Sequence, residues 1–228
     1  MGKLNSYHYH FGNAVTDLCK IGMITQADKS PYCTGKWRHS YTPLYDMLFS
    51  KMRYDNINIG EMGIYKGGSI EMWSQYFPNA NVYGWDHSDE FVNYVSGLNL
   101  DRVKIAKCNQ ADEQDLNRAL GEPGVKYDIL IEDGSHLAWD QIKFMRNAWR
   151  YLKPGGTMVI EDIGTHPEEF YPYNTKEELE DLLRDNLYMY NHMCYYSSIS
   201  FVEVDHENKF VDPFDNDKVL ILVRNNIE

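Results

Sequence analysis

The stretch YDILIEDGSH, residues 127–136, is an apolar run that ends in two carboxylates, a glycine, a serine and a histidine. The stretch TMVIEDIG, residues 157–164, is a second apolar run with the same Glu-Asp ending. Short, nearly continuous apolar runs are typical of parallel strands that are buried on both faces of a sheet. The two stretches therefore predict buried parallel strands whose carboxyl ends carry polar side chains.

Strand and helix signals alternate around these two stretches. The predicted strands are residues 56–62, 81–86, 102–107, 127–132 and 157–162. The predicted helices are residues 69–77, 88–95, 112–120 and 138–152. Such alternation is typical of βαβ units, in which helices cover both faces of a mostly parallel sheet.

The end of the chain departs from this alternation. Residues 198–204 and 218–224 are strand-like with a polar stretch between them, which predicts an antiparallel edge. We therefore expect an α/β fold with a seven-stranded, mostly parallel sheet. Residues 1–39 are predicted to be an irregular or helical N-terminal segment, and residues 40–228 a single domain with a loop-helix insertion at residues 163–190.

Composition narrows the possible classes of protein. The 228 residues include 22 Lys and Arg against 34 Asp and Glu, so the formal net charge is −12. Such a charge disfavours sequence-independent binding of nucleic acid, which needs basic patches. The four cysteines form no C-x-x-C pair, which argues against a zinc site and favours reduced thiols in a cytoplasmic protein. No apolar run approaches the roughly 20 residues of a membrane span.

A glycine-rich segment follows the first predicted strand. Ligands of an open α/β sheet bind outside the carboxyl ends of its strands. Gly63, Gly67 and Gly68 permit a tight turn and a close approach of the backbone to a ligand. Their spacing does not match the dinucleotide pattern G-x-G-x-x-G, and Glu61 would put a negative charge near a pyrophosphate. The segment therefore argues against a NAD-dependent oxidoreductase.

Two acidic residues stand at the next strand ends. Asp86 lies about 20 residues beyond the glycine-rich segment, where a carboxylate takes the ribose hydroxyls of an adenosine cofactor. A helix cap or a surface position is the alternative for Asp86. Asp112 has two possible roles, as the cap of the following helix or as the acceptor of an adenine amino group.

The motifs, taken in order, resemble a known family. They are EMGIYKGGSIEMW, VYGWDHS, NQAD, YDILIEDGSH and LKPGGTMVIEDI, with HSYTPLYD upstream. This set resembles the Rossmann-like class I S-adenosylmethionine-dependent methyltransferases. Within that class it is most similar to the metal-dependent sugar O-methyltransferases of macrolide biosynthesis, the macrocin and mycinamicin type. The resemblance covers roughly residues 36–164.

The resemblance implies S-adenosylmethionine and Mg²⁺ (or Mn²⁺) as cofactors and a sugar hydroxyl of a small molecule or glycan as acceptor. The implied cofactor-binding residues are Tyr41, Glu61, Gly63, Ser69, Asp86, Gln110, Asp112 and Asp133. The implied metal ligands are Asp133, Glu161 and Asp162. The implied catalytic residues are His136, as general base, and Asp133.

The residues themselves favour the same chemistry. Three carboxylates at two adjacent strand ends would repel one another without a cation, and oxygen ligands suit a hard ion such as Mg²⁺. Such an ion would ease deprotonation of one of two vicinal hydroxyls, and His136 could take the proton. A structural role next to the following helix is the alternative for His136. The family usually has D-D-G-S-H, and Glu132 at its first position is expected to point away, because neighbouring strand residues face opposite ways.

Several alternatives stay open at this stage. A catechol or another vicinal diol would use the same metal chemistry, and a protein related to cephalosporin hydroxylases would share the fold and similar motifs. A non-catalytic cofactor-binding module, or one domain of a larger chain, is a third possibility. The family carries a larger N-terminal region than this chain, so its contacts in a homo-oligomer do not transfer. The loop at residues 164–174, with His166 and the tyrosines of FYPYN, has two possible roles, as part of a substrate pocket or as a packed surface loop.

Overall fold

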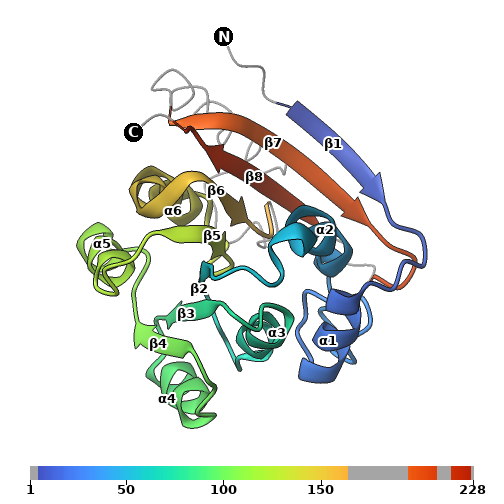
Figure 1. The fold of residues 1–228 in the computed structure, drawn as a ribbon, viewed down its shortest axis with the longest axis horizontal. Helices are drawn as coiled ribbons and strands as arrows, with labels where there is room; N and C mark the ends of the chain where they lie inside the picture. The colour runs from blue at the N-terminus through green and yellow to red at the C-terminus, as the bar shows by residue number, and fades with distance from the viewer. Residues whose placement is uncertain (1–4, 164–194, 210–216, 227–228) are drawn as a thin grey trace.

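The computed structural model describes residues 5–163, 195–209 and 217–226. Within them lies one eight-stranded sheet of order β1-β7-β8-β6-β5-β2-β3-β4 (Figure 1). The strands are β1 (Asn5–His10), β2 (Asn58–Met62), β3 (Asn81–Asp86), β4 (Val103–Lys107), β5 (Tyr127–Glu132), β6 (Leu152–Ile160), β7 (Tyr196–Asp205) and β8 (Lys218–Arg224). The α-helices are α1 (Asp17–Thr25), α2 (Tyr41–Phe49), α3 (Gly68–Tyr76), α4 (Asp89–Gly97), α5 (Glu113–Gly121) and α6 (Ala138–Ala148).

The predicted mostly parallel sheet with an antiparallel edge is confirmed. Strands β4, β3, β2, β5 and β6 pair in parallel, while β8 is antiparallel to both β6 and β7. The chain runs outward from β2 to β4 and then returns to the other side of β2 with β5. The strand order therefore reverses between β2 and β5, and ligands of such sheets bind at this reversal.

The predicted number of seven strands is wrong by one. Residues 5–10, expected to be irregular or helical, form β1, which pairs in parallel with β7 from Asn5 opposite Ser200 to His10 opposite Asp205. Most side chains of β1 are exposed, so it lacks the apolar run that marks a buried strand. An edge strand needs only backbone hydrogen bonds to its neighbour, and the sequence pattern does not reveal those.

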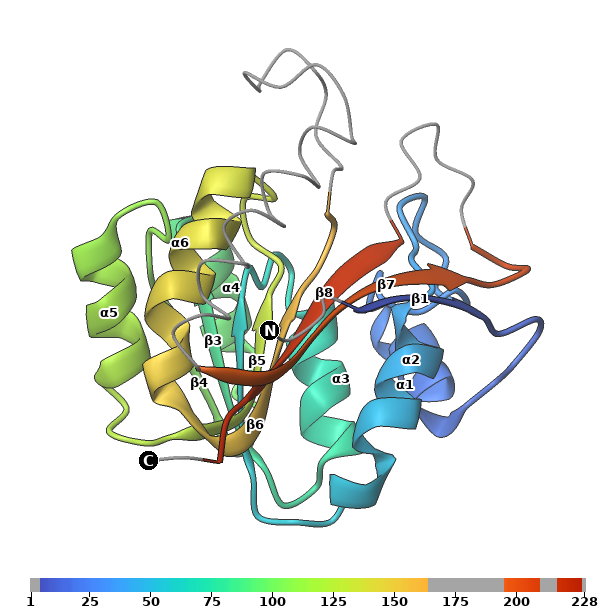
Figure 2. The same cartoon turned by 90° about the horizontal axis from the view of Figure 1, so that it is seen from above.

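Helices cover both faces of the sheet (Figures 1 and 2). One buried apolar cluster joins the sheet to α1, α2 and α3, with Val95 of α4 in the same cluster. A second cluster joins the other face to α5 and α6. The predicted apolar face of α3, with Ile70 and Trp73, is fully buried. The two clusters fix the strands from both sides and so set the positions of the strand ends.

The end of α6 and the start of β6 differ from the bounds predicted from the sequence. The predicted helix 138–152 ends at Ala148 and is followed by a 3₁₀ turn, Trp149–Tyr151. The segment KPGG at residues 153–156, whose Pro and Gly residues are typical of a turn, lies inside β6, where the pairing with β5 shifts register between Tyr127 and Ile129. Residues 164–190 of the predicted loop-helix insertion lie outside the described residues.

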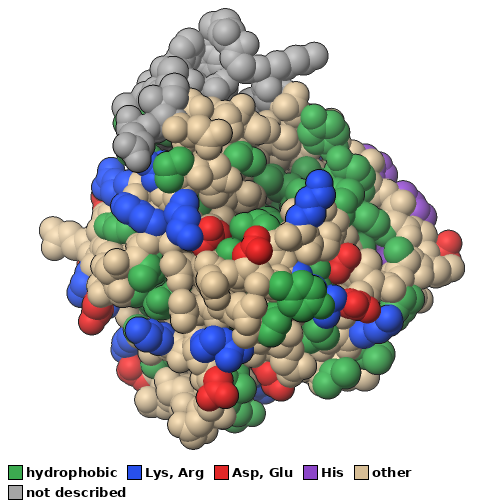
Figure 3. Space-filling view, viewed as in Figure 1, with side chains coloured by type: hydrophobic (Ala, Val, Ile, Leu, Met, Phe, Trp, Pro, Cys, Tyr) green, Lys and Arg blue, Asp and Glu red, His purple; other side chains and the backbone are tan. Residues whose placement is uncertain are grey.

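The surface mixes charges of both signs. Figure 3 shows Lys, Arg, Asp and Glu side chains interspersed over the face seen there. Among the described helices, none has the length and apolar content needed to cross a membrane.

Candidate active site

The ends of β2, β5 and β6 lie level at the reversal of strand order. Met62 pairs with Glu132, and Glu132 pairs with Ile160. This register brings together the carboxylates of Glu61 in β2, Asp133 after β5, and Glu161 and Asp162 after β6. Figure 1 shows the three strands as neighbours in the sheet. The predicted convergence of carboxylates at one edge of the sheet is therefore present in the structure.

A lysine that sequence reasoning did not single out lies among these carboxylates. The Nζ atom of Lys29 is 3.1 Å from Glu61 Oε1 and 2.8 Å from Glu161 Oε2, and it also pairs with Asp133 Oδ2. The side chain is 1% exposed. Burial lowers the pKa of Lys29, but the carboxylates, Asp133 foremost, raise it well above its usual value. Lys29 is therefore a buried ammonium held by three carboxylates.

Three other side chains converge beside this ammonium. Asp133, His136 and Asp162 each offer one ligand atom, and these atoms lie within 4.8 Å of one another. The Nδ1 atom of His136 is 3.9 Å from Asp133 Oδ1 and 3.9 Å from Asp162 Oδ2. Two carboxylates and an imidazole at this separation are a donor set that fits a divalent cation. We call Asp133, His136 and Asp162 the cation cradle.

Glu161, a predicted metal ligand, lies on the lysine side of Asp133. Its Oε2 accepts from Lys29, and its Oε1 accepts from the hydroxyl of Tyr45. Burial raises the pKa of Glu161 well above its usual value, although Lys29 lowers it. Each oxygen of Glu161 keeps a further lone pair, so these bonds are compatible with the predicted ligand role.

Asp162 of the cradle is contacted by Tyr41 and His39, and His39 in turn pairs with Asp217. Tyr41 donates to Asp162 Oδ1 over 2.6 Å, and the Nε2 atom of His39 is 3.8 Å from Asp162 Oδ2. The Nδ1 atom of His39 is 2.8 Å from Asp217 Oδ1, and the backbone N–H of Ser40 donates to Asp217 Oδ2. Burial lowers the pKa of His39, but Asp162 and Asp217 outweigh it and raise this pKa to about 10. His39 is therefore a second buried cation of the site.

The backbone at the cradle is unusual. His136 and Asp162 have φ values of 55° and 54°, a left-handed conformation that non-glycine residues adopt rarely. Such conformations gather at functional sites, where the surrounding structure compensates their cost. Gly63 has a φ of 87°, and a Cβ there would lie 1.9 Å from the carbonyl oxygen of Asp133. The glycine-rich turn therefore packs directly on the turn that carries Asp133 and His136.

The predicted cofactor-binding residues on β2, α3 and β3 border the same turn. Burial raises the pKa of Glu61 to about 7, and the charge of Lys29, with a smaller contribution from Ser69, opposes that rise. Asp86 is buried, and its Oδ2 accepts from the backbone N–H groups of Ile64 and Tyr65 at 3.1 Å. Asp86 thus ties the tip of β3 to the glycine-rich turn, and its contact with a ribose stays a prediction.

The remaining predicted residues have structural partners. Gln110 donates to Glu132 Oε1 over 2.9 Å and to the hydroxyl of Ser135 over 3.0 Å. Glu132 is fully buried and bonds to Gln110 and the N–H of Gly134, away from the lysine. Asp112 caps α5, where it accepts from two backbone N–H groups. The contacts of Gln110 and Asp112 with an adenine stay predictions.

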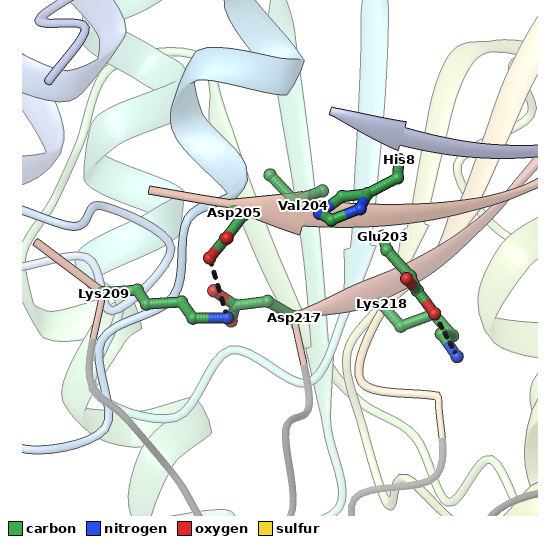
Figure 4. Close-up of a pocket in the computed structure, with 7 residues that line it drawn as sticks. All are labelled: His8, Glu203, Val204, Asp205, Lys209, Asp217 and Lys218. Carbon is green, nitrogen blue, oxygen red and sulfur yellow. Dashed lines mark ion pairs between the residues drawn. The ribbon is translucent and has the colours of Figure 1, made fainter. Parts of the chain in front are cut away.

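A pocket of about 120 Å³ adjoins the site through Asp217 (Figure 4). It is lined by His8, Glu203, Val204, Asp205, Lys209, Asp217 and Lys218. Lys209 pairs with Asp205 at 2.9 Å, and Lys218 pairs with Glu203 at 2.8 Å. Since these charges neutralise one another, the carboxylate cluster at the strand ends is the stronger candidate for chemistry.

The chain is similar in sequence to known methyltransferases. Residues 61–163 match the family described as "Methyltransferase domain". The chain is 36% identical over 156 residues to the 8-demethyl-8-(2-methoxy-alpha-L-rhamnosyl)-tetracenomycin-C 3'-O-methyltransferase of Streptomyces olivaceus, covering 65% of this chain and 37% of that protein. It is 34% identical over 145 residues to the mycinamicin VI 2''-O-methyltransferase of Micromonospora griseorubida, covering 60% and 35%. The chain thus spans just over a third of these relatives.

Solved structures give the same picture. The MycE methyltransferase of the mycinamycin pathway, in complex with Mg and SAH, superposes with a TM-score of 0.69 at 25% identity over 95% of this chain and 55% of that one. The O-methyltransferase TomG of Streptomyces achromogenes, in complex with SAM, superposes with a TM-score of 0.59 at 13% identity over 93% and 92%. The latter likeness concerns the fold alone.

Proposed function

Because the chain carries a methyltransferase domain on the fold of class I methyltransferases, we propose that it is a divalent-metal-dependent O-methyltransferase that uses S-adenosylmethionine and acts on a sugar hydroxyl. One observation carries the proposal. The cation cradle lies at the reversal of strand order, beside the glycine-rich turn. The relatives named for methylation of glycosylated small molecules support the class of acceptor.

The cofactor would lie along the ends of β2, β3 and β4. We assign its binding to Tyr41, Glu61, Gly63, Ser69, Asp86, Gln110, Asp112 and Asp133. Bound S-adenosylmethionine would supply a methyl group made electrophilic by the sulfonium charge. The buried carboxylate of Glu61 and the turn at Gly63 are the parts of this set that border the cation cradle.

Asp133 and Asp162, the two carboxylates of the cation cradle, would hold the divalent cation together with Glu161, which leaves proton transfer to the imidazole of His136. When bound, Mg²⁺ would ease deprotonation of the acceptor hydroxyl. The protein's own contribution is to fix these carboxylates, through Tyr41 on Asp162 and Tyr45 on Glu161. A fixed set of oxygens avoids the cost of arranging the ligands during the reaction.

His136 would take the proton from the acceptor hydroxyl. Its side chain is 28% exposed, so an acceptor can reach it, and its Nδ1 lies 3.9 Å from both cradle carboxylates. Those carboxylates would stabilise the imidazolium that forms. With the base, the acceptor oxygen and the methyl group aligned, positioning supplies much of the remaining rate.

The proposal is tested by incubating the protein with S-adenosylmethionine, Mg²⁺ and a panel of rhamnosylated polyketides and macrolide glycosides. Formation of S-adenosylhomocysteine is the readout, with simple catechols as competing acceptors. We expect turnover with a glycoside, its loss on chelation by EDTA, and its loss in Asp133→Ala. A folded wild-type protein that binds no S-adenosylmethionine in calorimetry would contradict the proposal.

A further inference from the structure

The Lys29 ammonium stands where a second cation would be expected. It lies in the segment between α1 and α2, yet it reaches three carboxylates at three strand ends: Glu61, Asp133 and Glu161. An ammonium has three N–H donors, which equals the number of carboxylate oxygens around it. The side chain is 1% exposed, so water does not replace these contacts. Lys29 is therefore the counter-ion of a buried cluster and not a surface ion pair.

Asp133 belongs to two cation positions at once. Its Oδ2 pairs with Lys29, while its Oδ1 faces His136 at 3.9 Å. The cluster thus has a position filled by the ammonium and a neighbouring position formed by the cation cradle, with Asp133 between them. A carboxylate shared by two neighbouring cation positions is the arrangement of two-metal sites, in which the ions lie about 3.5–4 Å apart.

The other oxygens of the lysine-side carboxylates are already fixed by neutral donors. Trp73 Nε1 donates to Glu61 Oε2 over 2.8 Å, and the Tyr45 hydroxyl donates to Glu161 Oε1. The oxygens that face Lys29 are therefore held in place from behind. Without Lys29 they would form a buried oxygen-rich position that lacks a positive charge, which is costly unless a cation fills it.

We propose that Lys29 permanently fills one of two adjacent cation positions, so that the protein binds a single divalent cation. Lys29 is a positioning residue that holds Glu61, Asp133 and Glu161 in place before the divalent cation binds. The inference rests on the proposed function, because the neighbouring position is that of the proposed catalytic ion. It goes beyond that function by assigning a role to a residue outside the strand-end motifs.

The test is the stoichiometry of Mn²⁺ binding, measured by equilibrium dialysis and by electron paramagnetic resonance at pH 8. The variants are Lys29→Met, which keeps an unbranched side chain one atom shorter but removes its charge, and Lys36→Met as the matched control. Lys36 lies in the same segment and is exposed, with its Nζ 5.1 Å from the Trp37 ring centroid. We expect one Mn²⁺ per chain in the wild type and the control, and two spin-coupled Mn²⁺ ions in Lys29→Met.

Two results would overturn the inference: two ions in the wild type, or one ion of unchanged affinity in Lys29→Met. If the wild type binds no ion while Lys29→Met binds one, the role of Lys29 stands and the proposed catalytic ion fails. If neither binds an ion, both fail. Should Lys29→Met not fold, the double variant Lys29→Met/Glu61→Gln removes one charge of each sign, and it is expected to bind two ions where the wild type binds one.

Discussion

At the residue scale, the glycine at position 63 allows the glycine-rich turn to pack on the turn that carries Asp133. Gly63 has a φ of 87°, and the carbonyl oxygen of Asp133 lies where a Cβ would be built. The backbone N–H of Gly63 donates to Trp85, and that of Asp133 donates to Met62. The position of Asp133 in the cradle therefore depends on the absence of a Cβ at residue 63.

Gly63→Ala should be severely destabilising. The added Cβ meets backbone atoms that cannot rotate away, and the left-handed φ is strained for alanine. We expect a loss of about 3 kcal/mol or more in the free energy of unfolding, measured with urea. Gly97→Ala in α4 is the control, since nothing lies within 4 Å of its added Cβ. Equal stability of the two variants would refute the close contact.

Tyr41→Phe tests whether the hydrogen bond from Tyr41 fixes Asp162 for metal binding. The change removes the donor to Asp162 Oδ1 and keeps the buried ring, which stacks on His39 at 5.0 Å. Loss of such an outer partner commonly lowers metal affinity or activity about 10–100-fold. We expect a drop of that size in Mn²⁺ affinity, measured by calorimetry. Tyr94→Phe, at an exposed position, serves as control, and an affinity unchanged in Tyr41→Phe would rule out the support.

Cys108 should make the protein lose stability at alkaline pH. Burial raises the pKa of its thiol from 9.0 to about 12. The thiol ionises at a lower pH in the unfolded chain than in the folded protein. The stability that the buried neutral thiol contributes is therefore complete below pH 9 and is lost as the pH rises toward 12. We expect the free energy of unfolding to fall more steeply between pH 9 and 11 in the wild type than in Cys108→Ala. Parallel pH curves for the two proteins would contradict this.

Single residues also show where sequence reasoning ended. The carboxylates were predicted because they stand at the ends of apolar runs, and a run is visible in sequence. Lys29 stands in a segment without periodicity, and Glu161, one of its partners, lies beyond five further strands of the chain. An isolated lysine carries no local signal of burial, because its burial is created by partners that are distant in sequence.

At the element scale, Asp112 joins the start of α5 to the proposed cofactor site. Its side chain accepts from the N–H groups of Gln114 at 2.8 Å and Asp115 at 3.1 Å. Both bonds end on Oδ1, and the carboxylate could also accept from an adenine amino group. The capping role affects the stability of the fold, whereas the adenine contact would affect cofactor affinity. Substitutions of Asp112 can therefore distinguish the two roles.

Asp112→Ala should lower the free energy of unfolding by about 1 kcal/mol, because the first turn of α5 loses its acceptor. Asp112→Asn should keep that stability, since Asn caps helices equally well. If the adenine contact also exists, Asp112→Ala weakens binding of S-adenosylmethionine in calorimetry. Stability that falls without any change in cofactor affinity would leave Asp112 as a cap alone.

The elements that sequence patterns predicted are those with continuous or periodic apolar residues. Strands β2 to β5 and helix α3 have continuous or periodic apolar residues, and each was found within a few residues of its predicted bounds. The strand β1 was missed because its side chains are mostly exposed. The start of β6 was missed because KPGG has the composition of a turn, and the pairing with β5 decides its conformation.

At the scale of the whole molecule, a divalent cation should stabilise the fold. It would join the ends of β5 and β6 through Asp133 and Asp162, and the unfolded chain lacks this site. A ligand at about 100 times its Kd adds about 2.7 kcal/mol to stability. We expect Mg²⁺ to raise the Tm and EDTA to reverse the rise. The exposed control Glu113→Ala should behave as the wild type, whereas an undiminished rise in Asp133→Ala would exclude this site.

The pairing of β1 with β7 has a consequence for how the protein is made. β1 emerges from the ribosome before strands β2 to β8, yet Ser200, which pairs with Asn5, is added 195 residues later. Until then β1 has no edge to pair with, and the closure of so long a loop slows folding. The nascent chain can assemble β2 to β5 as it is synthesised, but its outermost edge forms only after β7 and β8 have left the exit tunnel.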